Sequence, residues 1–171
     1  MCVKSLKSAD HRPRNIHSPT MSFKGALGEL RQLIRPYYVV NIRYITSSTT
    51  DFFFRLRASG TSAATNYNYQ MLLADGTGAS PTRSTSQTSF YGGGNTNGTF
   101  YSSTQLILFG PQLAEPTTIH GFNNQNAGSY TNTLERVFMG NHSTSTAYDG
   151  FELLIGTGTI TGTYAVYGYR A

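Results

Sequence analysis

The side chains of this 171-residue chain that could perform acid–base, metal or nucleophilic chemistry are few. A facing pair of carboxylates would suit glycoside hydrolysis, which some β-sandwiches support. Each of the six acids after residue 35 lies at a turn, precedes a proline or alternates with apolar neighbours, so we interpret each as an outward-facing, solvated group. These acids are Asp51, Asp75, Glu115, Glu135, Asp149 and Glu152.

The four histidines and the single cysteine are equally scattered. No two of His11, His17, His120 and His142 have the spacing of metal ligands on a shared strand face. His120 alternates with Ile119 in a candidate strand, which is typical of a satisfied or solvent-facing histidine. Cys2 lies near the N-terminus, far from any histidine of residues 36–171.

The chain also lacks the short motifs that accompany common enzyme chemistry. It has no Walker A loop, dinucleotide-binding glycine pattern after a strand, GxSxG elbow, HExxH motif or EF-hand loop. Gly92–Gly94 comes nearest to a phosphate-binding loop, but no lysine and helix follow it, so we interpret it as a plain loop. The sequence therefore predicts no catalytic residue, no metal ligand and no cofactor, and hence a protein that is not an enzyme.

The composition is typical of strands joined by many turns. Only 12% of the residues are charged, whereas Gly, Ser, Thr, Asn and Tyr are abundant. A single cysteine excludes an intrachain disulfide. No run approaches the roughly 18 apolar residues of a membrane span, and the basic start lacks the apolar segment of a signal peptide, so we expect neither a membrane partner nor secretion.

Apolar alternation with a period of two predicts about nine short strands. Tyr38–Tyr44 and Asp51–Ala58 are expected to form a hairpin, Tyr67–Leu73 to end at the Asp75-Gly76 turn, and Leu106–Phe109 to be apolar on both faces in the core. With no crossover helices evident, the pattern predicts an all-β fold, a two-sheet antiparallel β-sandwich of jelly-roll type. The other candidate strands end at Phe90-Tyr91 or span 117–122, 134–139, 151–155 and 164–170, separated by links at 76–88, 92–95, 123–129, 141–149 and 156–162.

The charge is divided unevenly and indicates two domains, an N-terminal arm over 1–35 and a sandwich over 36–171. The arm has seven bases against two acids, whereas the remainder has six of each sign. Residues 1–20 are expected to be extended, and the spacing in 22–35 is compatible with a short helix that Gly25 and Gly28 weaken. Scattered bases with few aromatic residues favour an acidic protein surface over nucleic acid as the docking partner. The candidate docking residues are Lys4, Lys7, Arg12, Arg14, Lys24, Arg31 and Arg35.

Six tyrosines among neutral polar residues are candidates for surface recognition. Flat rings beside Asn, Ser and Thr suit the binding of a glycan or a protein, although the same residues also serve strand formation and solubility. The six are Tyr67, Tyr69, Tyr91, Tyr101, Tyr130 and Tyr148.

Two segments carry a resemblance to a known domain. Phe54-Arg55-Leu56-Arg57-Ala58-Ser59-Gly60, followed by Asn66-Tyr67-Asn68-Tyr69, and the final Thr163–Ala171 segment resemble a jelly-roll domain of tailed-bacteriophage virion proteins. The resemblance covers roughly residues 36–171 and implies a virion structural protein, assembled in the cytoplasm of the bacterial host and exposed on the virion surface. It also implies a homo-oligomer, usually a trimer.

Two functions fit this resemblance. No long shaft precedes the domain, which favours a capsid decoration or cement protein that docks on the major capsid protein through residues 1–35. The alternative is a short tail-fibre or receptor-binding protein, whose tyrosine-rich loops would recognise a host-surface glycan or protein.

Overall fold

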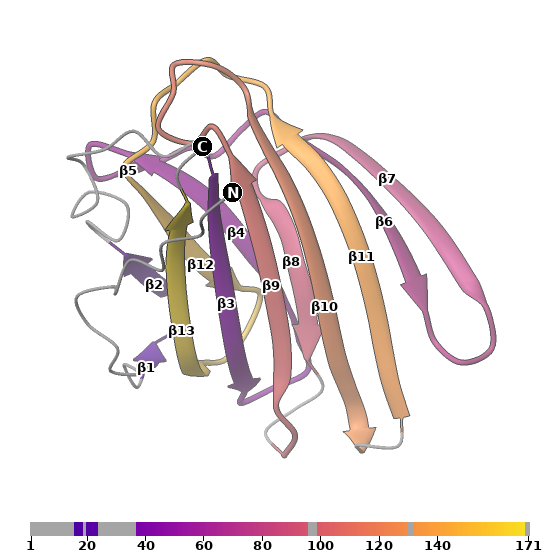
Figure 1. Cartoon of the computed structure of the whole chain (residues 1–171). Coiled ribbons are helices and arrows are strands. Elements are labelled where there is room, and N and C mark those ends of the chain that lie inside the picture. Colours follow the sequence, from indigo (N-terminus) through magenta and orange to yellow (C-terminus); the bar gives the residue numbers. More distant parts are fainter. Residues whose placement is uncertain (1–15, 19, 24–36, 96–98, 130–131, 170–171) are drawn as a thin grey trace, which may run out of the picture.

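The computed structural model describes residues 16–18, 20–23, 37–95, 99–129 and 132–169. These residues form strands and connections, and the strands make two sheets. Both sheets appear in Figure 1, with β3, β9, β10 and β11 in the nearer sheet and β4 and β12 behind. All strand pairs among the described residues are antiparallel, which confirms the predicted two-sheet β-sandwich.

The larger sheet has eight strands in the order β1-β13-β3-β9-β10-β11-β6-β7. Their bounds are β1 Ile16–Ser18, β3 Tyr37–Thr46, β6 Tyr67–Ala74, β7 Ala79–Gln87, β9 Ser102–Phe109, β10 Thr117–Ser129, β11 Asn132–His142 and β13 Ile160–Tyr169. The smaller sheet has the order β2-β12-β4-β5, and β8 also pairs with β4. Its bounds are β2 Thr20–Phe23, β4 Thr50–Ala58, β5 Thr61–Ser62, β8 Phe90–Asn95 and β12 Gly150–Ile155.

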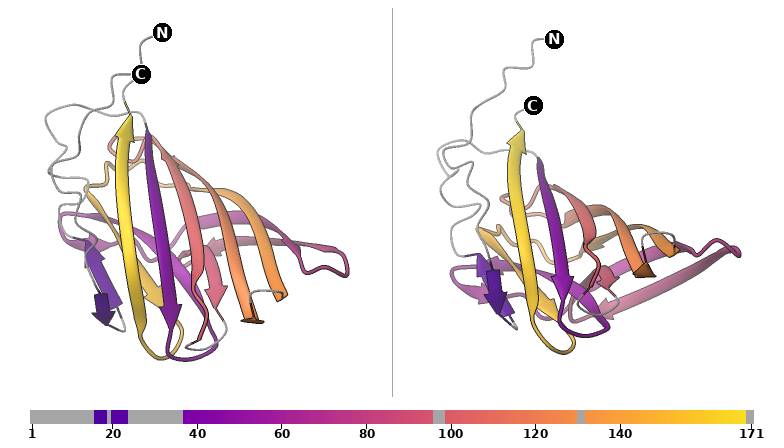
Figure 2. Two further views of the ribbon diagram at one scale, coloured as in Figure 1. Left: turned by 60° about the horizontal axis from the view of Figure 1, so that its bottom comes forward. Right: turned by 90° about the horizontal axis from the view of Figure 1, so that it is seen from below.

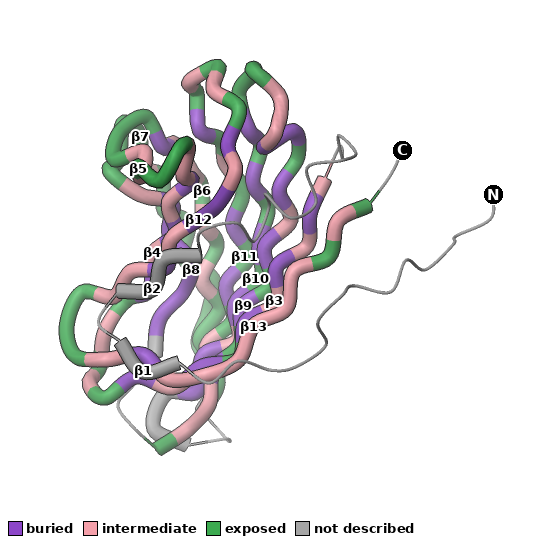
Figure 3. Tube along the Cα trace, turned by 90° about the vertical axis from the view of Figure 1, so that its left-hand side faces the viewer, coloured by how far each residue is buried: buried purple, intermediate pink, exposed green. Residues whose placement is uncertain are grey.

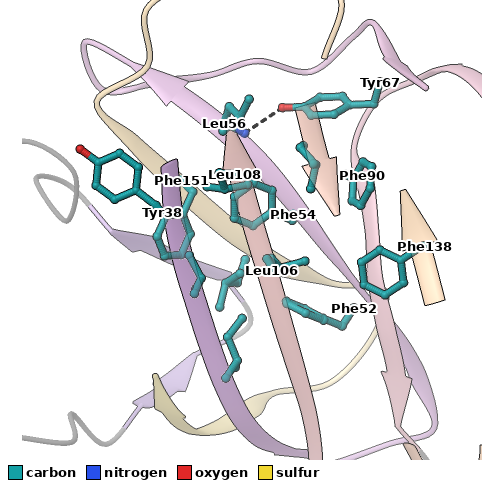
Figure 4. Close-up of a cluster of buried hydrophobic side chains, with 14 of the residues drawn as sticks. Tyr38, Phe52, Phe54, Leu56, Tyr67, Phe90, Leu106, Leu108, Phe138 and Phe151 are labelled. Atoms are coloured by element: carbon teal, nitrogen blue, oxygen red, sulfur yellow. Dashed lines mark hydrogen bonds between the residues drawn. The ribbon is translucent and has the colours of Figure 1, made fainter. Parts of the chain in front are cut away.

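The core fills the space between the two sheets, because strand alternation sends every second side chain inward. Phe54, Leu56 and Phe151 of the smaller sheet are fully buried, as are Leu106 and Leu108 of the larger sheet. Figure 4 shows these side chains gathered between the layers, and Figure 3 shows buried and exposed positions alternating along the strands. Burying several large apolar side chains, at about 1.5–3 kcal/mol each, is the main force that holds the sheets together.

Two expectations about individual strands are wrong. β3 and β4 are not a hairpin, because β3 belongs to the larger sheet and β4 to the smaller one. Both strands have one apolar face, and the two faces meet across the core, where the rings of Tyr44 and Phe52 lie 5.2 Å apart between centroids. Phe109 was expected in the core, but its side chain is 39% exposed, because only the alternate residues Leu106 and Leu108 point inward.

The glycine run that was interpreted as a loop is a buried strand. Gly92–Gly94 lie within β8, and neighbouring side chains occupy the space that a Cβ atom would need. A Cβ on Gly92 would lie 2.5 Å from the ring of Phe52, and one on Gly94 would lie 2.7 Å from the Gln125 amide oxygen. Glycine is required here because β8 runs close beneath these side chains.

Polar sequence also forms strands where links were predicted. The link predicted over 123–129 is the second half of β10, and most of the link predicted over 76–88 is β7. Nearly every residue of β7 is exposed, so this strand carries no apolar alternation. In both views of Figure 2 the β6–β7 hairpin projects away from the rest of the sandwich. Pro81 is tolerated in β7 because β7 is an edge strand.

Part of the N-terminal segment pairs with the sandwich. β1 pairs with β13 at one edge of the larger sheet, and β2 pairs with β12 in the smaller sheet. The helix expected within 22–35 lies outside the described residues, apart from Ser22 and Phe23, which belong to β2. In the described part of the chain, no helix is long and apolar enough to cross a membrane.

Candidate interaction surface

Half of the predicted recognition tyrosines are buried in the interior of the structure. Tyr67, Tyr91 and Tyr148 are at most 7% exposed, so the expectation of a surface role is wrong for these three. Tyr69 and Tyr101 are half-buried. Tyr130 and the seven basic residues of the arm lie outside the described residues.

Tyr67 is buried, and its hydroxyl links two other segments of the chain by hydrogen bonds. The backbone N–H of Leu56 donates to this hydroxyl at 2.8 Å, and the hydroxyl donates to the carbonyl of Ala63 at 3.1 Å; Figure 4 draws the first bond. Burial raises the pKa of Tyr67 above its ordinary value. A neutral hydroxyl with both functions satisfied stabilises the fold and offers nothing to a ligand.

His142 and Tyr148 form a second buried pair beside Tyr67. The Tyr148 hydroxyl lies 2.7 Å from Nδ1 of His142, and Nε2 of the same ring lies 3.0 Å from the Thr65 carbonyl oxygen. A neutral imidazole fits this environment, with Tyr148 donating to Nδ1 and the Nε2–H donating to Thr65. Burial lowers the pKa of His142 below 6.5.

We expect the neutral His142 to make the fold less stable in mild acid. The unfolded chain takes up a proton near pH 6.5 and the folded chain only at a lower pH, so stability is complete above that value and falls as the pH decreases. Urea titrations at about pH 7.5 and about pH 5.5 should show a lower midpoint at the acidic pH. His142→Gln should reduce this difference, and an unchanged pH dependence in that variant would contradict the assignment.

A polar network occupies the other side of the interior, between β3, β8, β9 and β10. The Tyr44 hydroxyl donates to the Gly94 carbonyl at 2.9 Å. The side-chain amide of Asn123 donates to the Tyr44 hydroxyl at 3.2 Å and to the Thr104 hydroxyl at 3.1 Å. Burial, which outweighs these hydrogen bonds, raises the pKa of Tyr44 to about 12.

Arg136 extends this network from β11. Its guanidinium donates to the side-chain oxygens of Asn123 and Gln125, and it lies 5.7 Å from the ring centroid of Tyr91. The Tyr91 hydroxyl in turn donates to Asp51 at 3.0 Å. A guanidinium held by neutral amide oxygens and an aromatic face joins the two sheets. Its buried Nε has no hydrogen-bond partner among the described residues.

The exposed apolar residues lie on the opposite face of the larger sheet. All seven large apolar residues that are exposed in the described part of the chain point outward from this sheet, with exposed fractions between 39% and 53%. We call this set the outer apolar face; it comprises Leu72, Phe109, Phe122, Val137, Met139, Tyr167 and Tyr169. The register places them beside one another: Phe122 pairs with Val137, and Val137 pairs with Leu72.

Aromatic rings continue this face across four strands. Tyr37 of β3 stacks on Tyr169 of β13 at 4.9 Å and lies 5.9 Å from Phe109 of β9, measured between ring centroids. Phe109 lies 5.3 Å from the ring of His120 in β10, and His120 pairs with Met139 of β11. His120 is exposed, as expected for a solvent-facing strand position.

Charged residues are confined to the borders of this face. Among the described residues, register places Arg43, Arg83 and Glu135 on the outer side of the sheet, and all three are exposed. Arg43 lies in the last outward-facing row in which β3 pairs with β9, with its guanidinium 3.5 Å from the ring centroid of Tyr101. The neutral side chains of Asn41 and Gln105 also lie on this side, hydrogen-bonded to each other at 2.8 Å. Depletion of charged residues from the centre is typical of a protein–protein interface.

No family model, curated protein or solved structure matches this chain. The described residues contain no group of three or more His, Cys, Asp or Glu that could hold a metal ion. The exposure, register and chemistry of the outer apolar face make it the candidate functional site.

The outer apolar face was not predicted from the sequence, although the composition of β11 indicates it. Val137 and Met139 alternate with Arg136 and Phe138, so both faces of β11 carry large side chains. In a strand buried on one side only, that composition indicates an outer face that is also apolar. The sequence could not show which side Arg136 takes, because its burial depends on Asn123 and Gln125 in another strand.

Proposed function

We propose that the protein is a structural component of a bacteriophage particle, a capsid decoration protein that acts through surface contacts and performs no chemistry. The observation that carries this proposal is the outer apolar face, which presents its large side chains to solvent on one side of the sandwich. Monomeric proteins rarely leave such a contiguous patch uncovered, and a particle surface offers neighbours that would cover it.

The polar interior supports a structural role as well. Three polar side chains most resemble functional groups, namely Tyr44, Arg136 and His142. Their hydrogen bonds are made with other residues of the chain. Networks of this kind hold a rigid body in one conformation. Rigidity serves a component whose task is to bridge neighbours on a particle.

Two observations favour decoration over receptor binding. The positive charge excess lies in residues 1–35 and suits docking on an acidic protein surface such as that of a major capsid protein. The receptor-binding alternative relied on six tyrosines, and three of them are buried. Of the other three, Tyr69 and Tyr101 are half-buried.

Imaging of labelled particles would test this proposal. We expect the label over the capsid, and we expect particles that lack the protein to survive heating or high salt less well than complete particles, because inter-subunit contacts are lost. Complementation with the full chain should restore survival. Complementation with a chain in which the seven basic residues of the arm are replaced by glutamine, which keeps β1 and β2, should not. A label confined to the tail, or particle survival unchanged by the loss, would overturn the decoration proposal.

A further inference from the structure

We propose that the outer apolar face binds a second copy of this chain through a two-fold axis that runs parallel to the strands, midway between β9 and β10. The inference deepens the proposed function by naming the occupant of the face. It concerns the purified protein alone, so it can fail while the decoration proposal stands, and the reverse is equally true.

The area of the face approaches the area that each partner contributes to a stable interface. A fully accessible aromatic side chain presents about 150–250 Å², so seven large side chains exposed by 39–53% present roughly 600 Å². Half-buried Tyr37, Val39 and Ile107 on the same side add to this total. Each partner in a standard interface contributes about 800 Å².

Charge makes the face complementary to itself. Arg43 and Glu135 lie in one row across the sheet, because Glu135 pairs with Asn124, Asn124 with Ser103, and Ser103 with Arg43. The proposed axis exchanges β11 with β3, so Glu135 of one copy faces Arg43 of the other, twice in the assembly. No two like charges therefore face each other across the proposed dimer interface. Two identical surfaces can pack together only if this condition is met.

The same symmetry sets each row of one copy against the same row of the other. Val39 and Met139 share a row with Ile107 and His120, and the axis sets Met139 of one copy against Val39 of the other. In the adjoining row, Leu72 of β6 faces the small side chain of Ala165 in β13. Val137 faces Asn41 there, and Phe122 faces Gln105. Large apolar side chains of one copy thus face smaller or neutral polar ones of the other, and packed sheets lie about 10 Å apart.

A charge exchange on the full chain tests this arrangement. Sedimentation equilibrium should show the wild-type protein as a dimer at micromolar concentration. Arg43→Glu and Glu135→Arg should each weaken dimerisation at least about tenfold, because each creates two like-charge contacts, and the double variant should return to within a few-fold of the wild type.

A charge in the centre of the face gives a second test. Met139→Glu should abolish the dimer, whereas Ala64→Glu, at an exposed position in the loop before β6, should leave it intact. Circular dichroism and thermal unfolding should show both variants folded, because Met139 is already 53% exposed in one copy.

Three outcomes would overturn the proposal. One is a wild-type protein that remains monomeric up to about 100 μM, well above the micromolar range of an ordinary interface of this size. Another is a dimer that Met139→Glu leaves unchanged, which would place the contact elsewhere. The third is an oligomer, such as the trimer suggested by the sequence resemblance, that the double charge exchange fails to restore.

Discussion

Replacing Gly93 with alanine is expected to lower the free energy of unfolding by about 3–5 kcal/mol. Gly93 has a φ of 138°, a conformation that L side chains rarely adopt, and a Cβ atom here would lie 2.5 Å from the amide nitrogen of Asn123. Asn123 cannot move aside freely, because its amide donates to Tyr44 and Thr104. Backbone strain and overpacking therefore act together.

Urea denaturation of the two proteins measures this loss. Gly78→Ala is the matched control, because Gly78 has open space around its Cβ position and no positive φ. Its free energy of unfolding should stay within about 0.5 kcal/mol of the wild type. If Gly93→Ala were equally mild, β8 would not run against Asn123 as described.

Phe54→Ala is expected to destabilise the protein by about 3–5 kcal/mol. The Phe54 side chain is fully buried and stacks on Phe151 of β12, with ring centroids 5.2 Å apart. Its removal costs the transfer free energy of the ring and leaves a cavity between the sheets that close packing fills poorly. Urea denaturation at neutral pH again provides the measurement.

The neighbouring residue Phe53 is the control for this prediction. It points to the other face of β4 and is only partly buried, with an edge contact to Tyr91 at 5.9 Å between ring centroids. Phe53→Ala should therefore cost clearly less than Phe54→Ala. Equal losses at the two positions would contradict the burial of one face of β4 and thus the sandwich itself.

Alternation predicted the strands whose inward residues are apolar and failed where polar residues point inward. Tyr38–Tyr44 and Asp51–Ala58 were assigned correctly because their buried faces are apolar. Asn123 and Gln125 in β10 are buried too, but their acceptors are satisfied by Arg136, a residue more than ten positions away. A pattern within one segment contains no information about such a partner.

The error over β3 and β4 has a similar origin. A short polar link between two alternating strands is compatible with a hairpin in one sheet and with a crossing between two sheets, because both bury one apolar face of each strand. The decision depends on which other strands pair with each. β3 pairs with β9 and β13, whereas β4 pairs with β12 and β8.

The pairing of β3 with β13 also bears on how the chain acquires its fold. Tyr37 pairs with Tyr169, so two strands that are far apart in the sequence lie side by side in the larger sheet. Closing a loop of that length costs conformational entropy, which is offset only once the two strands have paired. Topologies dominated by such distant pairs fold in about milliseconds to seconds. During synthesis β3 lacks this neighbour until the last strand has left the ribosome. For most of its translation, the nascent chain therefore carries an open sheet edge that other nascent chains could pair with.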